Sequence, residues 1–481
     1  MTRAGTRATQ SVPALLASRA GEARTWLRFE GDSWTFADAL AQADRFAVGL
    51  AERGVAKGDR VAILIGNAPG HLFAWLGANL LGAIAVPLHV GWKAPEIEAM
   101  VAHVRPRVIV ADELAPAAAN AGVPIVSCAE LARAGSGAPH ADVSPDDVAV
   151  LLCTSGTTGA PKAVMQTHRA YVLTAEAFPS WLGLGESDRM LAMLPLAHVN
   201  AQAYSVMGSI GCGAELVLVP KFSASRFWDE ARAAGATQFN AVGAIVSILA
   251  RAEPRADDRE NPVRLCYTAL ALPEEKHRAF EERFGLRMIV GYGLSETTFG
   301  TIWPKDEPPR YGTMGKLRQH PRLGAMNEAR LDPDGELLLR SPATMRGYWD
   351  DPAQTAAALS PDGWFRTGDI VRRDDDGWFT FVSRKKEILR RRGENVAAAE
   401  IENALCTHPA VREAAAVGRP SALGEDDIVA FVILAPGAAA SGDELRAFLA
   451  TRLADFKVPS RIEIRADFPR TATERIAKHL L

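Results

Sequence analysis

The sequence lacks the features that identify several common classes of protein. It has no excess of charge of one sign, because 54 Lys and Arg residues stand against 57 Asp and Glu residues among 481 positions. The net charge of −3 gives no general attraction to nucleic acid or anionic lipid. Five scattered cysteines with no C-x-x-C pair predict reduced thiols rather than a disulfide scaffold. We therefore expect a cytoplasmic protein that binds no nucleic acid.

Long hydrophobic runs are also absent. Residues 61–92 contain no Asp, Glu, Lys or Arg, but Gly and Pro interrupt them, so no apolar span of about 20 residues remains. The basic start of the chain has no apolar segment of the kind that a signal peptide needs. We expect no membrane span, and a strand, turn, helix and strand across 61–92 instead.

A regular alternation of two patterns is present. Short β-branched runs bounded by Gly, Pro, Asp or Asn predict buried strands, and Ala- and Leu-rich segments of helical period predict helices between them. Strands are expected at 61–65, 84–88, 108–110, 148–153 and 216–219, and helices at 35–53 and 225–234. The alternation predicts an α/β fold, with a large N-terminal domain of mixed sheets covered by helices.

A basic stretch at 383–392 separates this pattern from a shorter one. Beyond it the sequence predicts helices and strands at 397–406, 414–417, 428–434, 442–453 and 461–464. About 95 residues suffice for a small α+β domain. We place the boundary near Lys386, which gives domains of residues 1–385 and 386–481.

The most specific local motif is T-S-G-T-T-G-A-P-K at residues 154–162, directly after an apolar run. Two glycines let the backbone approach a ligand closely, and four hydroxyls and the backbone N–H groups can donate to phosphate oxygens. Lys162 adds a positive charge. The spacing is not that of G-x-x-x-x-G-K-[ST], because Gly159 and Lys162 are three residues apart. The motif predicts a phosphate-binding loop of another kind.

This loop resembles that of the adenylate-forming (ANL) superfamily, which includes acyl- and aryl-CoA synthetases, luciferases and peptide-synthetase adenylation domains. Further segments resemble its other motifs in the same order: G-Y-G-L-S-E-T at 291–297, W-F-R-T-G-D at 364–369, Arg384, and G-E-N-V at 393–396. The resemblance extends over nearly the whole chain. It implies an ATP-dependent ligase that uses Mg²⁺ and has a small, mobile C-terminal domain.

The resemblance also assigns roles to single residues. Adenylation brings a carboxylate up to the α-phosphate, so cations and N–H donors must offset the repulsion. Glu296 would hold Mg²⁺, Tyr292 would lie beside adenine, and Asp369 and Arg384 would bind the ribose. The implied catalytic residues are Lys162, His198, Glu296 and Arg475. The implied ATP-binding residues are Thr154, Ser155, Gly156, Thr157, Thr158, Gly159, Lys162, Gly291, Tyr292, Gly293, Ser295, Glu296, Thr297, Asp369 and Arg384.

A pocket for the acid is expected between these motifs. The resemblance implies that it is lined by His198, Asn200, Ala241, Gly243, Ala271 and Gly291. The wall segments 241–244 and 268–272 carry no charge, which favours an apolar or aromatic acid over a dicarboxylate. Segments 195–198 and 456–460 most resemble small-acid CoA ligases, including the carnitine and crotonobetaine type.

A hinge and a binding site for CoA are expected after the N-terminal domain. In the superfamily the small domain rotates between two half-reactions near the position of Lys386. Guanidinium groups pair bidentately with phosphate, so the basic residues that follow could bind the phosphates of CoA. The residues assigned to this second step are Lys386, Arg390, Arg391, Arg392 and Gly393. The alternative is a solvated basic strand edge.

The C-terminal motif departs from the superfamily pattern P-[RK]-T-x-x-G-K. Residues 469–475 read P-R-T-A-T-E-R, so Glu474 replaces the glycine. Arg475 replaces the lysine that, in the superfamily, stabilises the acyl-adenylate transition state. Arginine keeps the charge but is planar and bulkier. Lys478 is expected at the surface.

Three functions remain open on the sequence. The first is a CoA ligase acting on an aryl or short acyl carboxylic acid, with Arg475 in the role of the lysine. The second is an ATP-dependent diazotase of secondary metabolism, which activates nitrite and transfers the nitroso group to an aryl amine. The third is an inactive nucleotide-binding scaffold. The partners expected are therefore a small acid and either CoA or an aryl amine.

Overall fold

The computed structural model describes residues 11–138, 140–155, 161–269, 272–391, 394–420, 426–453, 455–470 and 476–481. The chain divides into two compact units. The first comprises Met1–Ala329, Leu339–Phe365 and Asp376–Trp378, and the second comprises Arg330–Leu338, Arg366–Asp375 and Phe379–Leu481. Two segments of the second unit thus precede Lys386 in the sequence. A domain boundary at Lys386 stays a prediction.

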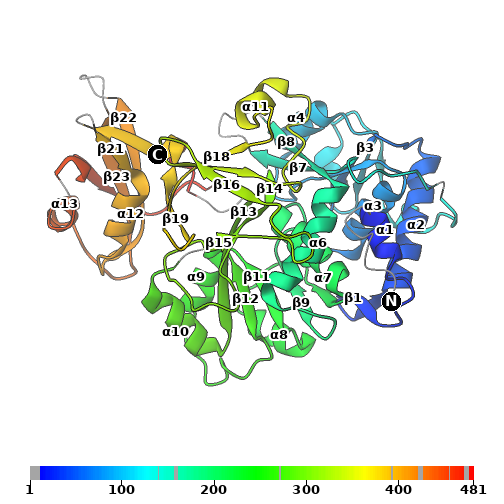
Figure 1. Cartoon of the computed structure of the whole chain (residues 1–481), viewed down its shortest axis with the longest axis horizontal. Helices are drawn as coiled ribbons and strands as arrows, with labels where there is room; N and C mark the ends of the chain where they lie inside the picture. Colours follow the sequence, from blue (N-terminus) through cyan, green and yellow to red (C-terminus); the bar gives the residue numbers. More distant parts are fainter. Residues whose placement is uncertain are drawn as a thin grey trace. The chain divides into compact units, whose positions relative to one another are not determined.

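The larger sheet of the first unit has nine strands (Figure 1). The five neighbouring pairs from β1 to β13 are parallel, and antiparallel strands complete both edges. The spatial order is β15 (Lys316–Leu317), β14 (Thr297–Ile302), β13 (Arg287–Leu294), β12 (Leu265–Thr268), β11 (Gln238–Ala241), β9 (Arg189–Ala192), β10 (Glu215–Leu218), β1 (Thr25–Phe29) and β2 (Asp32–Thr35).

A second sheet of the first unit has six strands. Its neighbours are parallel except for the last pair, β7 and β8, which form an antiparallel hairpin. The order is β6 (Ile125–Val126), β5 (Val108–Ala111), β3 (Arg60–Leu64), β4 (Ile84–Pro87), β7 (Val148–Ser155) and β8 (Pro161–Thr167). The hairpin carries the predicted phosphate loop at its turn.

Helices connect the parallel strands of both sheets, as parallel pairing requires. In Figure 1, α8, α9 and α10 lie beside β11 and β12. The α-helices of the first unit are α1 (Val12–Ala17), α2 (Phe36–Glu52), α3 (Pro69–Leu80), α4 (Ala94–Val104), α5 (Cys128–Ala132), α6 (His168–Leu182), α7 (Met207–Cys212), α8 (Phe227–Ala234), α9 (Gly243–Arg251), α10 (Glu274–Phe284) and α11 (Pro352–Ala358). Their starts follow local signals: Thr35 and Asp38 form a capping box at α2.

The structure confirms the predicted α/β class and the strands and helices named from the sequence. The uncharged stretch at 61–92 contains β3, α3 and β4, and α3 is buried on nearly all sides. Burial on every side explains why this stretch shows no amphipathic period. The largest buried cluster draws on both sheets and includes Trp26, Trp75 and Phe239. No helix in the described part of the chain is long and apolar enough to cross a membrane.

The second unit contains most of a four-stranded sheet and a smaller α+β part. The four strands are β16 (Glu328–Leu331), β17 (Glu336–Arg340), β18 (Phe365–Arg373) and β19 (Phe379–Arg384). The smaller part has β20 (Ile388–Arg391) paired with β21 (Glu394–Ala397), and the sheet β22 (Val411–Pro420), β23 (Asp426–Leu434) and β24 (Arg461–Ile464). Helix α12 (Ala398–Cys406) packs on β22, and α13 (Gly442–Ala450) packs on β24.

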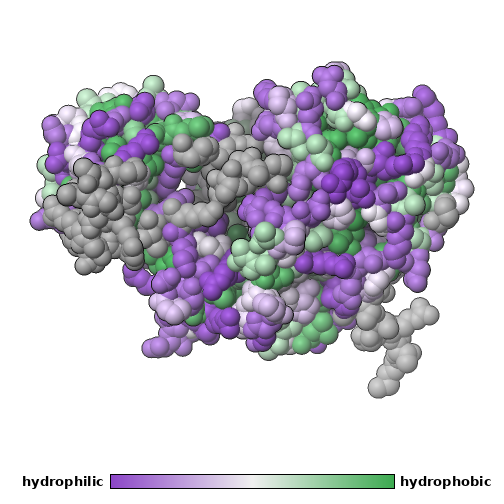
Figure 2. All heavy atoms as spheres, turned by 90° about the horizontal axis from the view of Figure 1, so that it is seen from above, coloured by the Kyte–Doolittle hydropathy of each residue, from purple (hydrophilic) through white to green (hydrophobic). Residues whose placement is uncertain are grey.

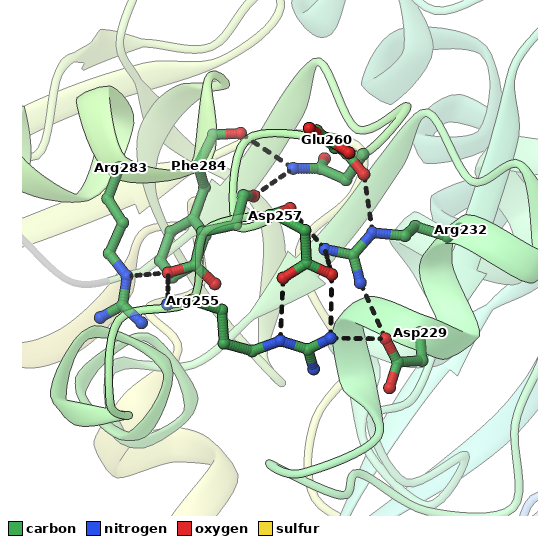
Figure 3. A network of polar contacts seen from close by, with 9 residues as sticks. Asp229, Arg232, Arg255, Asp257, Glu260, Arg283 and Phe284 are labelled. Carbon is green, nitrogen blue, oxygen red and sulfur yellow. Dashed lines mark hydrogen bonds and ion pairs between the residues drawn. The ribbon is translucent and has the colours of Figure 1, made fainter.

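An ion-pair network fixes the connection between α9 and β12 (Figure 3). Arg255 pairs with Asp257 at 2.9 Å and with Asp229 at 3.4 Å, and Arg232 pairs with Asp229 at 2.8 Å. Arg283 donates from its guanidinium to backbone carbonyls of residues 250, 252 and 253. Exposed pairs add little stability singly, but together these hold the chain that leads into β12.

Hydrophilic residues predominate on the face of the molecule drawn in Figure 2, with hydrophobic residues scattered among them. Large exposed hydrophobic side chains occur one at a time, such as Val242 and Ile248 at the start and within α9. Scattered exposed hydrophobic residues are normal for a folded domain and indicate no docking face by themselves.

Candidate active site

The β7–β8 hairpin brings the two ends of the predicted phosphate loop together. Thr154 pairs with Lys162 and Ser155 with Pro161 in the strand register. Gly156, Thr157, Thr158 and Gly159 lie outside the described residues, as do the side chains of Thr154 and Ser155. The hairpin therefore fixes where the loop starts and ends, and Lys162 lies at its C-terminal end, on β8.

A segment that the sequence analysis did not single out pairs with the same hairpin. Tyr348 forms a β-bridge with Val164, and the N–H of Trp349 donates to the carbonyl of Ala163 at 2.8 Å. The ammonium of Lys162 lies 5.1 Å from the centre of the Tyr348 ring, within range of a cation–π interaction. The aromatic pair in G-Y-W at 347–349 was the one signal available in the sequence.

Glu296 joins this group through Tyr348. The Tyr348 hydroxyl donates to Glu296 Oε1 at 2.9 Å, and burial raises the pKa of this tyrosine, so the hydroxyl remains a donor. Glu296 Oε2 accepts no hydrogen bond or ion pair from the described residues. A carboxylate oxygen with a fixed partner and a second oxygen left available suits a hard cation such as Mg²⁺, which prefers oxygen ligands.

The backbone beside Glu296 is fixed as well. Gln166 Nε2 on β8 donates to the carbonyl of Ser295 at 2.5 Å, and the N–H of Met345 donates to the carbonyl of Glu296 at 2.7 Å. Thr297 is fully buried at the start of β14. Tyr292 is half-buried on β13. The adenine and magnesium motif and Lys162 therefore lie in one part of the first unit.

The residues expected to bind the acid gather at one edge of the nine-stranded sheet. Ala241 is the last residue of β11 and pairs with Thr268, the last of β12. Thr268 pairs in turn with Val290 of β13, one residue before Gly291. Parallel strands present their carboxyl ends at the same edge, where ligands of open α/β sheets bind. Gly243 begins α9 at this edge, and Ala271 lies outside the described residues.

His198 and Asn200 reach this edge from the turn after β9. Asn200 begins a π-helix that runs to Val206, and its Oδ1 accepts from Asn240 Nδ2 on β11 at 2.9 Å. The His198 ring lies 5.3 Å from the ring of His89, centre to centre. Burial lowers the pKa of His89, which keeps this second imidazole neutral at pH 7. His89 was not predicted from the sequence.

Asn67 holds the turn that carries His198. Its Oδ1 accepts from the N–H of Leu196 at 2.9 Å, and its Nδ2 donates to the carbonyls of Leu194 and Val219 at 3.1 and 3.2 Å. The side chain is 6% exposed, so these bonds satisfy it within the protein. Asn67 thereby ties the end of β3 to the turn between β9 and the π-helix.

A charged side chain lies behind the sheet edge where the acid pocket is expected. The segments named for it carry none, but Arg318 places a guanidinium directly behind Gly291. Arg318 is 1% exposed and donates to the hydroxyls of Tyr204 and Tyr267. Arg318 lies in the sequence K-L-R-Q-H at 316–320, and nothing in this local pattern predicts its burial.

Asp369 and Arg384, the residues that the resemblance assigns to the ribose, lie in the second unit. Asp369 on β18 is fully buried, and its Oδ1 pairs with Arg384 Nε at 2.9 Å. The two residues are also register partners in the β18–β19 ladder. Thr367 Oγ1 accepts from the N–H of Asp369 at 3.1 Å, and Gly368 takes φ +70°, a conformation that favours glycine. The carboxylate is thus held at a fixed place beside the guanidinium of Arg384.

The predicted hinge region also lies in the second unit. Lys386 is in a short 3₁₀ helix, Lys385–Glu387, and its side chain is not among those that the structure describes. Its neighbour Lys385 pairs with Asp334 and Glu336, each at 3.1 Å, and the hydrogen bonds that its ammonium donates to these carboxylates raise its pKa. Arg390 and Arg391 are on β20 without described side chains, and Arg392 and Gly393 are outside the described residues.

Lys478 is not the surface residue that was expected. Its ammonium pairs with Glu387 at 3.0 Å and with Glu402 at 2.8 Å, and all three side chains are at least half-buried. Burial raises the pKa of Glu402, so this carboxylate depends on the lysine to stay ionised. Arg475 lies outside the described residues. In this arrangement Lys478 is committed to two carboxylates and is unsuited to the role of the missing lysine.

Two protein-family profiles and a characterised ligase match this chain. The profile of the AMP-binding enzyme family matches residues 16–349, and that of the AMP-binding enzyme C-terminal domain matches residues 400–475. The chain is 32% identical over 459 residues, 88% of each chain, to the crotonobetaine/carnitine–CoA ligase of Salmonella arizonae.

Solved structures match over the full length. ATP-bound MatB from Rhodopseudomonas palustris superposes with a TM-score of 0.89 at 25% identity, with 98% of each chain covered. The O-succinylbenzoate coenzyme A synthetase MenE from Bacillus subtilis, in complex with ATP and magnesium ion, superposes with a TM-score of 0.87 at 26% identity, covering 98% of this chain and 99% of the other.

Proposed function

We propose, from the finding that the chain belongs to the family of AMP-binding enzymes, that it is an ATP-dependent, AMP-forming ligase. In the first half-reaction the oxygen of a small oxyacid attacks the α-phosphorus of ATP, the acid–AMP anhydride forms, and pyrophosphate leaves. In the second, the sulfur of CoA attacks the activated acid, a thioester forms, and AMP leaves. The acid is an aryl or short acyl carboxylic acid.

The observation that carries the proposal is the group of Lys162, Tyr348 and Glu296. This group lies beside the turn of the β7–β8 hairpin. Two anions must meet during adenylation, so the site must hold positive charge where the phosphates lie. Lys162 supplies a point charge beside the loop. Glu296 would hold Mg²⁺ through Oε2, and bound Mg²⁺ neutralises charge on the phosphate oxygens.

Asp369 and Arg384 are proposed to bind the ribose. A carboxylate can accept two hydroxyl hydrogens, because both of its oxygens are acceptors, and the Asp369 carboxylate is buried and paired with Arg384. Arg384 is 34% exposed at its side chain, which leaves part of the guanidinium accessible to a phosphate oxygen. Tyr292 is proposed to lie beside the adenine.

The carboxyl edge of β11, β12 and β13 is proposed to bind the acid. Ala241 and Gly291 present little side chain there, and His198 and Asn200 bring polar groups from the turn after β9. His198 is proposed to contact the reacting carboxylate. Asn67 acts as a positioning residue, because it contacts the turn and not the acid.

CoA is favoured over an aryl amine as the acceptor. The crotonobetaine/carnitine enzyme and MenE are both named as CoA ligases or synthetases. Lys386 is proposed as the hinge between residues 1–385 and 386–481, with Arg390, Arg392 and Gly393 contacting CoA in the second half-reaction. Arg475 is proposed to take the role of the superfamily lysine in the first.

A screen for pyrophosphate release tests the proposal. Purified protein is supplied with ATP, Mg²⁺ and aryl acids, short acyl acids or nitrite, each with and without CoA. We expect release that requires an acid, and AMP release that requires CoA as well. Nitrite-dependent release accelerated by an aryl amine would select the diazotase. ATP binding without release from any acid would identify a scaffold, and Lys162→Ala controls for contaminating activity.

A further inference from the structure

One face of β13 is filled by the protein's own side chains. Gly291 and Gly293 point to the same face, because alternate residues of a strand share a face. A Cβ at Gly293 would lie 2.6 Å from Tyr204 Oη, and one at Gly291 would lie 2.6 Å from Tyr267 Oη and against Arg318. Real Cβ atoms do not approach so closely. The space that these glycines open is therefore occupied by Tyr204, Tyr267 and Arg318.

These three side chains form a rigid wall. Arg318 Nη1 donates to Tyr204 Oη at 2.9 Å, Nη2 donates to the Tyr267 hydroxyl, and Nε donates to the carbonyl of Thr301 at 2.8 Å. Tyr204 Oη donates in turn to the carbonyl of Thr298 at 2.9 Å. Arg318, Tyr204 and Tyr267 are 1%, 4% and 1% exposed. A closed and buried hydrogen-bond network of this kind resists displacement by a ligand.

The wall adjoins the proposed acid pocket. Tyr204 is on the same π-helix as Asn200, four residues further along, and Tyr267 immediately precedes Thr268 at the end of β12. Strand β13 carries Gly291, which lies against the wall and is also proposed to line the acid pocket. An acid that binds at this carboxyl edge would therefore lie next to the wall.

Arg318 also gives the wall a net positive charge. In the described part of the chain its guanidinium pairs with no carboxylate, and its acceptors are two hydroxyls and two carbonyls. The rings of Trp181, Tyr204 and Tyr267 lie 4.9–5.4 Å from its central carbon. Arginine stays protonated in proteins, so the charge persists and is only partly offset by neutral neighbours. The positive charge of the Arg318 guanidinium therefore favours the binding of an anion beside Gly291.

Resting on the proposed function, we infer that Tyr204, Tyr267 and Arg318 close the inner end of the acid pocket and restrict the substrate to small acid anions. Formate, acetate, propionate and nitrite are of this class, whereas benzoate and hexanoate extend into the wall. The wall sets the size limit, and the guanidinium strengthens binding of the anion. Of the aryl and short acyl acids allowed by the proposed function, this assignment selects the short ones.

Two kinds of variant separate the wall from the charge. Tyr204→Ala and Arg318→Ala shorten the wall from two sides, and we expect each to raise kcat/KM for hexanoate or benzoate relative to acetate by about tenfold or more, as cutting back a pocket wall does. Arg318→Met keeps the bulk and removes the charge, so we expect weaker binding of every small acid with an unchanged size ranking. Tyr311→Phe, which alters a tyrosine outside the wall that packs on His277 and Trp303, serves as the matched control.

The experiment measures pyrophosphate release and, separately, acid binding by calorimetry for wild type and the variants. Wild-type protein that uses or binds benzoate or hexanoate as well as acetate overturns the inference, as does an unchanged ranking in both alanine variants. Binding of no acid at all overturns it too. Size-ranked binding without pyrophosphate release leaves the inference standing and rejects the proposed function, so the two failures are distinguishable.

Discussion

The hydroxyl of Tyr348 donates a 2.9 Å hydrogen bond to Glu296 Oε1 across 52 residues of sequence. The bond forms because the segment with Tyr348 pairs with β8, the strand that leaves the predicted phosphate loop. The pairing of Tyr348 with β8 therefore places this tyrosine both beside the C-terminal end of the loop and within hydrogen-bond distance of the Glu296 carboxylate. Among the described residues, none donates a hydrogen bond to Glu296 Oε2.

Tyr348→Phe should weaken the use of Mg²⁺. The substitution keeps the ring beside Lys162 and removes the only hydrogen bond that the described residues donate to the Glu296 carboxylate, which is worth roughly 1.5–3 kcal/mol because the acceptor is charged. We expect the Mg²⁺ concentration for half-maximal pyrophosphate release to rise about tenfold. Tyr311→Phe, which alters a tyrosine packed on His277 and Trp303, is the matched control. Identical Mg²⁺ curves for Tyr348→Phe and wild type would contradict the role of this bond.

Lys162→Ala should raise the KM for ATP by about tenfold or more, since a charge-assisted contact to phosphate is lost. The acid pocket does not include this residue, so acid binding measured by calorimetry should stay within error. Lys305→Ala removes an exposed lysine that pairs with Asp306 and controls for net charge. Equal ATP kinetics in the two variants would show that Lys162 does not face the nucleotide.

Much of the fold followed from local sequence. Buried parallel strands such as β3 and β5 are short β-branched runs between turn residues, and that pattern is independent of what packs on them. The motif residues Glu296 and Asp369 were identified because each belongs to a run with a recognisable chemistry. Glu296 lies in the turn between β13 and β14, and Asp369 lies in the middle of β18.

Long-range pairing explains what the sequence did not predict. Tyr348 contributes only because its segment adds to the β7–β8 hairpin, and no local pattern near it specifies that pairing. Arg318 is buried because Tyr204, Tyr267 and Trp181, from three distant segments, surround it. Lys478 is held by Glu387 and Glu402 for the same reason, whereas its sequence neighbourhood is that of an exposed terminus.

Acid should destabilise the protein through two buried histidines. Burial lowers the pKa of His71 and of His168 to about 4. An unfolded histidine titrates near 6.5, so between pH 6.5 and 4 unfolding takes up one proton at each site. The stability that neutral burial provides is present above pH 6.5 and is lost as the pH falls. We expect the free energy of unfolding to drop by about 1.4 kcal/mol per pH unit for each histidine.

Urea unfolding at pH 7.5, 6.0 and 5.0 measures this slope. His71→Asn and His168→Asn each remove one titrating group while keeping a polar side chain for the partners, the carbonyl of Ile65 and the N–H of Val12. Each variant should show a slope smaller than that of wild type by about 1.4 kcal/mol per pH unit. A free energy of unfolding that does not change from pH 6.5 to 5.0 would rule out neutral burial of both rings.

Lys478→Met should destabilise the second unit. The substitution leaves the half-buried carboxylates of Glu387 and Glu402 without their common cation, and breaking a partly buried pair costs about 1–3 kcal/mol. Adding Glu402→Gln removes one of the stranded charges and should restore part of the loss. Thermal unfolding of the single and double variants measures both effects. A double variant that is less stable than Lys478→Met would show that Glu402 has other partners to satisfy.

Arg475 should control adenylation without controlling ATP binding. Its guanidinium is the only cation left at the motif position of the superfamily lysine, and Lys478 is committed to Glu387 and Glu402. Losing one preorganised donor in a transition state costs on the order of 10²–10³ in rate, so Arg475→Ala should slow single-turnover adenylation by that factor while nucleotide affinity holds. Arg475→Lys restores a compact charge and should recover much of the rate. Full-rate adenylation by Arg475→Ala would mean that another group takes this role, and Lys478→Met in the same background would then reveal whether the lysine leaves its carboxylates to do so.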